Sequence, residues 1–171
     1  MNAGRRLRVL PFLCVGLVGL GVVACGSGGG SSPTEPGGVS ALEVEQRSFE
    51  LLNDARAGAG VTPPFNLDSA LTQVARQHSQ SMRDNGYFGH RDPEGRNLVQ
   101  RLAEAGISFS AAAENLARVS GAPDPAGWAH DQLLQSQEHR DNILNGDFRL
   151  VGVGVAQAGD TYWITQVFLK P

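Results

Sequence analysis

Two histidines and one glutamate are the side chains in this sequence best placed by type to carry chemistry. Glu114 lies within a run of alanine and leucine that indicates burial, so its carboxylate needs a cation or strong hydrogen bonds. His90 and His139 lie 24 and 25 residues on either side of it and are its candidate partners. Two imidazoles and a carboxylate can hold Zn²⁺ with a position left open for water, or can form a proton-transfer cluster. Spacing alone equally allows unrelated surface and structural roles.

Several common chemistries have no motif here. The sequence contains no phosphate loop, dinucleotide fingerprint, CxxC pair or G-x-S-x-G elbow. A serine nucleophile stays open at Ser136, three residues before His139, although helix capping explains that position equally well. Of the other two histidines, His78 is expected to be a core residue satisfied by a hydrogen bond, and His130 a residue of a helix surface.

The elements that must position these residues can be predicted from caps, stops and apolar spacing. We expect His90 on a turn-rich loop, Glu114 on a buried extended segment, and His139 on a short helix that begins after Ser136 and stops at Asn145-Gly146. Further helices are expected after four capping residues, Ser40, Asp68, Asn97 and Asp124.

Two strands joined by a hairpin are predicted at the C-terminal end, over residues 150–157 and 161–169. Val151, Val153 and Val155 would line one face of the first strand. Gly152 and Gly154 would leave the opposite face bare, for close approach of a helix or a ligand.

The N-terminal part of the chain has the layout of an export signal. Three arginines precede an uncharged apolar run from Val9 to Val23, and Val22-Val23-Ala24-Cys25 resembles the lipobox of bacterial lipoproteins. The resemblance implies cleavage after residue 24 and lipidation of Cys25. A plain signal peptide with a chance cysteine is the alternative.

The predicted organisation is a signal peptide over 1–24, a lipid-anchored linker over 25–39 and one domain over 40–171. Residues 26–38 are almost entirely Gly, Ser and Pro, which cannot form a core. Removal of the leader leaves 11 of the 14 basic residues against 17 acidic ones, so the net charge changes from −3 to −6. An acidic surface of this kind argues against a nucleic-acid ligand.

Five segments in order resemble the bacterial branch of the CAP superfamily, which groups cysteine-rich secretory proteins, antigen 5 and plant pathogenesis-related proteins. The resemblance covers about Glu45 to Lys170. The segments are Phe88-Gly89-His90, Glu114-Asn115-Leu116, Ser136 to Leu144, Val151 to Val155, and Tyr162 to Phe168.

The resemblance implies an α+β fold, a three-layer α-β-α sandwich, with a cleft that in eukaryotic members holds two histidines and two acids, sometimes with zinc. His90 matches the first histidine and Glu114 the first acid. The second acid falls near Ser136 and the second histidine near Tyr162 or Trp163, so the set is incomplete and His139 belongs to the bacterial pattern instead.

We therefore predict a cell-envelope lipoprotein, attached to the membrane through Cys25, whose CAP-like domain binds an unknown lipid, glycan or protein ligand. It is expected to be an extracytoplasmic monomer and more a binding module than an enzyme. The alternative is a metal-assisted hydrolase or peptidase that uses His90, Glu114 and His139, with His90 and His139 as ligands of Zn²⁺.

Overall fold

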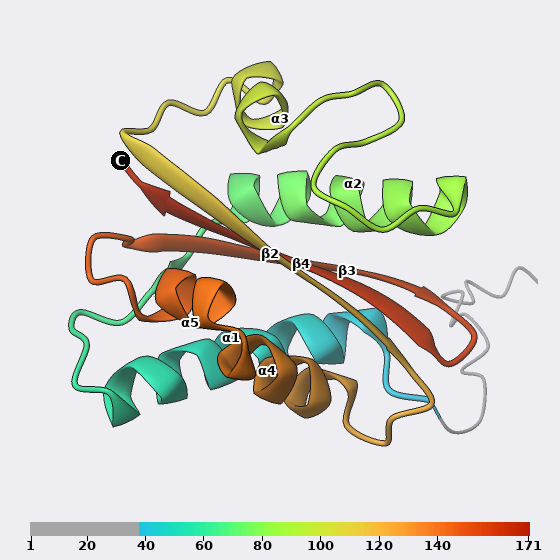
Figure 1. The fold of residues 1–171 in the computed structure, drawn as a ribbon, viewed down its shortest axis with the longest axis horizontal. Helices are drawn as coiled ribbons and strands as arrows, with labels where there is room; N and C mark the ends of the chain where they lie inside the picture. Colours follow the sequence, from blue (N-terminus) through green and yellow to red (C-terminus); the bar gives the residue numbers. More distant parts are fainter. Residues whose placement is uncertain (1–37) are drawn as a thin grey trace, which may run out of the picture. The chain divides into compact units, whose positions relative to one another are not determined.

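A computed structural model describes residues 38–171 (Figure 1). The predicted leader, Cys25 and most of the linker lie outside these residues. The helices are α1 (Ala41–Gly58), α2 (Ser69–Asn85), α3 (Leu98–Glu104), α4 (Pro125–Gln135) and α5 (Gln137–Leu144), and the strands are β1 (Asn66–Leu67), β2 (Ala111–Ser120), β3 (Leu150–Ala158) and β4 (Thr161–Lys170).

The strands form one sheet in the order β1-β3-β4-β2. The long strands β3, β4 and β2 are antiparallel, and the predicted hairpin joins β3 to β4. Gly159 takes the left-handed conformation in its turn, with φ 58°. The two-residue β1, which the sequence did not predict, pairs in parallel with the start of β3. Strand β2, which carries Glu114, is an edge strand.

Helices cover both faces of the sheet, so the predicted three-layer α-β-α sandwich is confirmed (Figure 1). Helices α2 and α3 lie on one face. Helices α1, α4 and α5 lie on the other.

The predicted caps account for the starts of four helices. Ser40 and Glu43 form a complete capping box at α1, and Asn97 and Gln100 form another at α3. Asp68 and Asp124 accept backbone hydrogen bonds at α2 and α4. Ser136 stands at the N-cap of α5, but its side chain makes no capping hydrogen bond, so the predicted capping role is wrong there.

The glycines of β3 let α2 lie directly on the sheet. A methyl group on Gly152 would overlap the backbone of Leu71 and Thr72, and one on Gly154 would overlap that of Ala75 and Arg76. Close approach of a helix, as predicted, is therefore what these glycines permit. The valines between them face the other layer, where they join the larger apolar core.

Two further observations qualify the sequence predictions. His130 is 8% exposed and its Nδ1 has no hydrogen-bond partner among the described residues, so its assignment to a helix surface is wrong. His130 is buried together with Ala126, Ala129 and Leu133 on α4, a helix that packs against α1.

Within residues 38–171, no helix is both long and apolar enough to cross a membrane.

Candidate functional site

Glu114 is the centre of the candidate site. Its side chain is 3% exposed, and both carboxylate oxygens are hydrogen-bonded to basic side chains. Oε1 lies 2.9 Å from Nδ1 of His90, and Oε2 lies 2.5 Å from Nη2 of Arg101. Hydrogen bonds to both oxygens offset part of the cost of burying a carboxylate. The expectation that Glu114 is buried against a histidine is confirmed.

Arg101 of α3 ties this carboxylate to the loop that carries His90. The guanidinium is almost fully buried, and its Nη1 donates to the backbone carbonyls of His90, at 3.0 Å, and Arg96, at 3.2 Å. One side chain thus fixes the acid and the backbone of its histidine partner. Arg101 was not identified from the sequence. Its position three residues after Leu98 and four before Ala105, on the apolar side of α3, was the available signal.

His90 is the exposed member of the cluster. Its side chain is 57% exposed, so the ring is open to solvent while its Nδ1 contacts Glu114. The hydrogen bond to Glu114 raises the pKa of His90, and partial burial and the nearby Arg101 oppose that shift. His90 is therefore an accessible group that favours the protonated form.

His78 lies behind the cluster on α2 and has the opposite tendency. Its side chain is fully buried, with Nε2 3.0 Å from the carbonyl of Gly89 and Nδ1 3.4 Å from the hydroxyl of Tyr87. Burial lowers the pKa of His78, although Glu114 lies 4.0 Å away. The predicted core histidine, held by hydrogen bonds, is confirmed.

His139 is on α5, on the other side of the sheet from α2 and α3. Its backbone carbonyl accepts from Nδ2 of Asn115, whose Oδ1 accepts from Asn142. Burial lowers the pKa of His139, as does the positive charge of nearby His90. The structure thus pairs Glu114 with His90 and brings His139 near His90, but no hydrogen bond joins His139 to Glu114 within residues 38–171.

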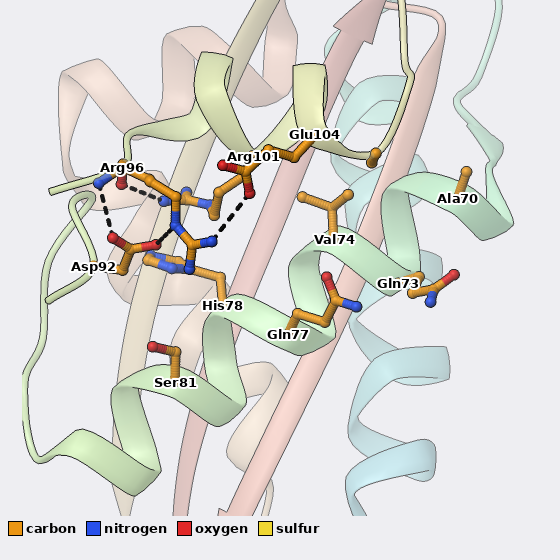
Figure 2. Close-up of a pocket in the computed structure, with 11 residues that line it drawn as sticks. Ala70, Gln73, Val74, Gln77, His78, Ser81, Asp92, Arg96, Arg101 and Glu104 are labelled. Carbon is orange, nitrogen blue, oxygen red and sulfur yellow. Dashed lines mark hydrogen bonds and ion pairs between the residues drawn. The ribbon is translucent and has the colours of Figure 1, made fainter. Parts of the chain in front are cut away.

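A pocket of about 350 Å³ opens beside this cluster, between α2 and the segment from Asp92 to Ala105 (Figure 2). His78 and Arg101 form part of its wall, so the pocket adjoins Glu114 through two of the residues around that carboxylate. Its lining consists of Ala70, Gln73, Val74, Gln77, His78, Ser81, Asp92, Arg96, Arg101, Glu104 and Ala105.

Arg96 organises the charged side of the pocket. Its guanidinium bonds Asp92 at 2.8 Å and Glu104 at 3.0 Å, as the dashed lines of Figure 2 mark, and lies 3.5 Å from Glu94. Asp92 is buried and also accepts the backbone N–H of Arg96, so the loop closes on itself. These bonds hold one wall of the pocket in place.

Comparison with known proteins decides the family. Residues 49–168 match the family described as CAP: Cysteine-rich secretory protein family. The chain belongs to this family. The match covers most of the range 38–171, which agrees with the resemblance found in the sequence.

Two of the similar proteins come from Bacillus species. The chain is 34% identical over 139 residues to protein YkwD of Bacillus subtilis, covering 81% of this chain and 51% of that protein. A solved extracellular protein of Bacillus anthracis that contains an SCP domain is 31% identical, with a TM-score of 0.64 over 82% of this chain and 45% of that one. The chain thus spans about half the length of each.

A more distant structure shares the fold. An outer surface protein of Borrelia burgdorferi has a TM-score of 0.69 at 20% identity, over 77% of this chain and 96% of that one. At this identity the likeness concerns the fold of the CAP domain alone.

The positions where the eukaryotic pattern would complete its histidine and acid set have other roles in this CAP domain. Tyr162 is buried, and its hydroxyl donates to the carbonyl of Val39. Trp163 is half-buried and its Nε1 has no partner among the described residues. Ser136 stands at the start of α5. None of the three supplies the missing acid or histidine.

The residues present do not fit the expected zinc site. Within residues 38–171, no group of three or more His, Cys, Asp or Glu side chains is arranged to hold a metal ion. Arg101 also places a guanidinium against Glu114, which disfavours a cation there. Zinc binding by His90 and His139 stays a prediction of the sequence, and the function proposed below uses no metal.

Proposed function

We propose that the protein is an extracytoplasmic binding module whose CAP domain takes its ligand at the face of α2 and α3, beside His90. The Bacillus anthracis relative supports the location, since that protein is described as extracellular. The pocket next to the Glu114 cluster supports binding, because it combines an apolar floor with polar groups held in fixed positions.

The pairing of Glu114 is the observation that carries this proposal. A general base must reach the proton that it abstracts, whereas the Glu114 side chain is 3% exposed and both of its oxygens are bonded to His90 and Arg101. The acid therefore acts as an internal anchor for the loop and α3. A carboxylate in that role supports a rigid binding surface better than it supports hydrolysis.

Binding to the cell envelope tests the proposal. Full-length protein should cosediment with isolated envelope fractions in a saturable way. Ala70→Trp, which fills the pocket, should reduce this binding about tenfold or more through overlap with the ligand. Ala103→Trp, at an exposed position of α3 outside the pocket, is the matched control and should bind like the parent.

The hydrolase alternative makes a contrary prediction. Multiple turnovers on peptide or cell-wall substrates that vanish in His90→Ala would contradict the binding proposal. Stoichiometric binding without turnover supports it.

We also propose that lipidation of Cys25 attaches the protein to the membrane. The support is the sequence around Cys25, followed by a linker with no core-forming residues. Cys25→Ser should release the protein from the membrane fraction without unfolding the CAP domain. Cys14→Ser is the control, because the lipoprotein pathway removes Cys14 with the leader. Membrane fractionation of Cys25→Ser equal to that of the parent contradicts this proposal.

A further inference from the structure

The pocket between α2 and α3 carries a more specific inference, which rests on the proposed binding function. We propose that it binds a neutral saccharide, one or two sugar rings in size. Three features support this ligand class: the charge balance of the pocket, two amide side chains on α2, and the nature of the floor.

The formal charges that line the pocket balance. Two arginines, Arg96 and Arg101, face two acids, Asp92 and Glu104. The remaining ionisable side chain of the lining is His78, and burial lowers its pKa and so favours the neutral ring. The lining residues alone thus carry no net formal charge, so the attraction of an ion depends on which of these charges remain unpaired.

The individual charges are also already paired. Arg96 is shared among Asp92, Glu94 and Glu104, and Arg101 is bonded to Glu114. A phosphate or carboxylate ligand would have to compete with these internal carboxylates for each arginine. The same pairing occupies Asp92, whose side chain is 2% exposed, so a cation would find no free buried acid in this pocket. A neutral polar ligand needs none of these bonds to break.

Two amides provide hydrogen bonds that the protein itself does not use. Gln73 and Gln77 lie one turn apart on α2, are exposed, and line the pocket. Neither side chain makes a hydrogen bond to any residue of the described range 38–171. Each amide offers two donors and one acceptor group, and a sugar hydroxyl both donates and accepts. The side chains of i and i+4 residues lie side by side, so the pair can address neighbouring hydroxyls of one ring.

The floor of the pocket is small and apolar. Val74 lines the pocket together with the two glutamines of α2, and Ala70 and Ala105 border it (Figure 2 labels Val74 and Ala70). An apolar floor suits the C–H face of a sugar ring, while the amides and Glu104 meet its hydroxyls. The volume of about 350 Å³ is at the small end of ligand pockets, which run from about 300 to 1,000 Å³. This size admits one or two rings rather than a long chain.

Saturation-transfer NMR on the full chain tests the proposal with a defined probe. The disaccharide chitobiose, which is neutral and carries hydroxyl and acetamido groups, should show saturation transfer from the parent protein. Gln73→Ala/Gln77→Ala should weaken its Kd about tenfold or more, because two ligand hydrogen bonds are lost.

The matched control removes two amides from outside the pocket. Gln46 of α1 and Gln80 of α2 are both exposed, and neither lines the pocket, so Gln46→Ala/Gln80→Ala should bind chitobiose like the parent. Glucose 6-phosphate should bind no more tightly than glucose, because no arginine of the pocket is free for its phosphate.

Three results would overturn the saccharide proposal. They are absence of saturation transfer to chitobiose, equal Kd values for the parent and the Gln73→Ala/Gln77→Ala variant, and tighter binding of glucose 6-phosphate than of glucose. Envelope binding that is lost in Ala70→Trp but occurs without any affinity for chitobiose would reject the ligand class and leave the binding function standing. Absence of both envelope binding and chitobiose binding in the parent protein would reject the binding function as well.

Discussion

The two faces of the sheet are packed in different ways. The face under α1, α4 and α5 carries the larger apolar core, in which Val153, Ile164 and Phe168 are among the buried sheet residues. The face under α2 and α3 has a smaller apolar cluster of Leu71, Val74, Ala75, Leu102, Val167 and Leu169. Beside that cluster lie the buried polar groups His78, Asp92, Arg101 and Glu114. Burial of apolar area therefore stabilises mainly the first face, the one under α1, α4 and α5. In the second face, under α2 and α3, charged side chains that hold the candidate site take up part of the interior.

Among residues 38–171, each face contains one buried arginine, and the two differ in their partners. Arg56, on the first face, donates to the backbone carbonyls of Ile143, Asn145, Pro63 and Phe148. These contacts hold chain segments together through carbonyl groups. Arg101 pairs with Glu114 and with the loop of His90. A buried arginine thus stabilises the fold on one face and the candidate site on the other.

Removal of Arg101 should have the largest effect. Arg101→Met leaves the Glu114 carboxylate buried without its main partner, and loss of one member of a buried pair costs about 3 to 5 kcal/mol of unfolding free energy. Urea denaturation measures the loss. Arg101→Met/Glu114→Gln should recover part of it, because no unpaired charge then remains. Arg47→Met, at an exposed position of α1 where the arginine pairs with the exposed Glu50, is the control and should be close to neutral.

The close packing of α2 on the sheet predicts that a larger side chain at Gly154 destabilises the fold, with the next largest effect. Gly154→Val should lower the free energy of unfolding by about 1 to 3 kcal/mol, because the side chain would displace the backbone of α2 at Ala75 and Arg76. Gly146→Val places the same side chain where nothing lies within 4 Å and should change the urea midpoint little. Equal midpoints for both variants would show that α2 does not press on β3.

The sequence alone predicted the features of the fold that depend on residues close together along the chain. The starts of four helices were predicted correctly, because the side chain of a capping residue bonds the backbone only two or three residues further along the chain. The capping residues are Ser40, Asp68, Asn97 and Asp124. The alternation of Val and Gly in β3 likewise reported which face a helix approaches.

The charged cluster depends on tertiary packing and was only partly predictable. Burial of Glu114 and contact with His90 followed from the alanine-rich run, because a buried carboxylate needs a partner. Arg101 was missed because its pairing arises only when α3 packs on β2. His139 was grouped with Glu114, but α5 lies on the other face. The mere presence of a histidine or arginine on an amphipathic helix does not specify which distant strand it meets.

His130 offers a smaller test, on the first face. Its buried Nδ1 has no partner within residues 38–171, and burial lowers the pKa of the ring. His130→Leu should therefore keep or raise the free energy of unfolding, by up to about 1 kcal/mol, since it removes an unsatisfied polar group. His78→Leu is the comparison and should be destabilising, because its ring is bonded to Gly89 and Tyr87. Destabilisation by both changes would contradict the account of His130.

The pH dependence of His90 should be the smallest effect on stability. Because folding raises its pKa, the stabilising contribution of protonated His90 is fully present below the unfolded pKa and is lost as the pH rises through the folded pKa. The difference in unfolding free energy between the parent and His90→Ala should thus be greater at about pH 5 than at about pH 9. Exposure of the ring keeps this difference to a few tenths of a kcal/mol. A difference that grows with pH would contradict the assignment.

Histidine NMR titration of the parent and of Glu114→Gln tests the central claim, that Glu114 is an anchor paired with His90. In the parent, His90 should titrate above its ordinary pKa, and His78, His130 and His139 below theirs. Glu114→Gln should lower the pKa of His90 and, to a smaller extent, that of His78, since both rings lose a nearby negative charge. Glu138→Gln is the matched control and should lower the pKa of His139 while leaving His90 unchanged. A pKa of His90 that is the same in the parent and in Glu114→Gln would contradict the claim.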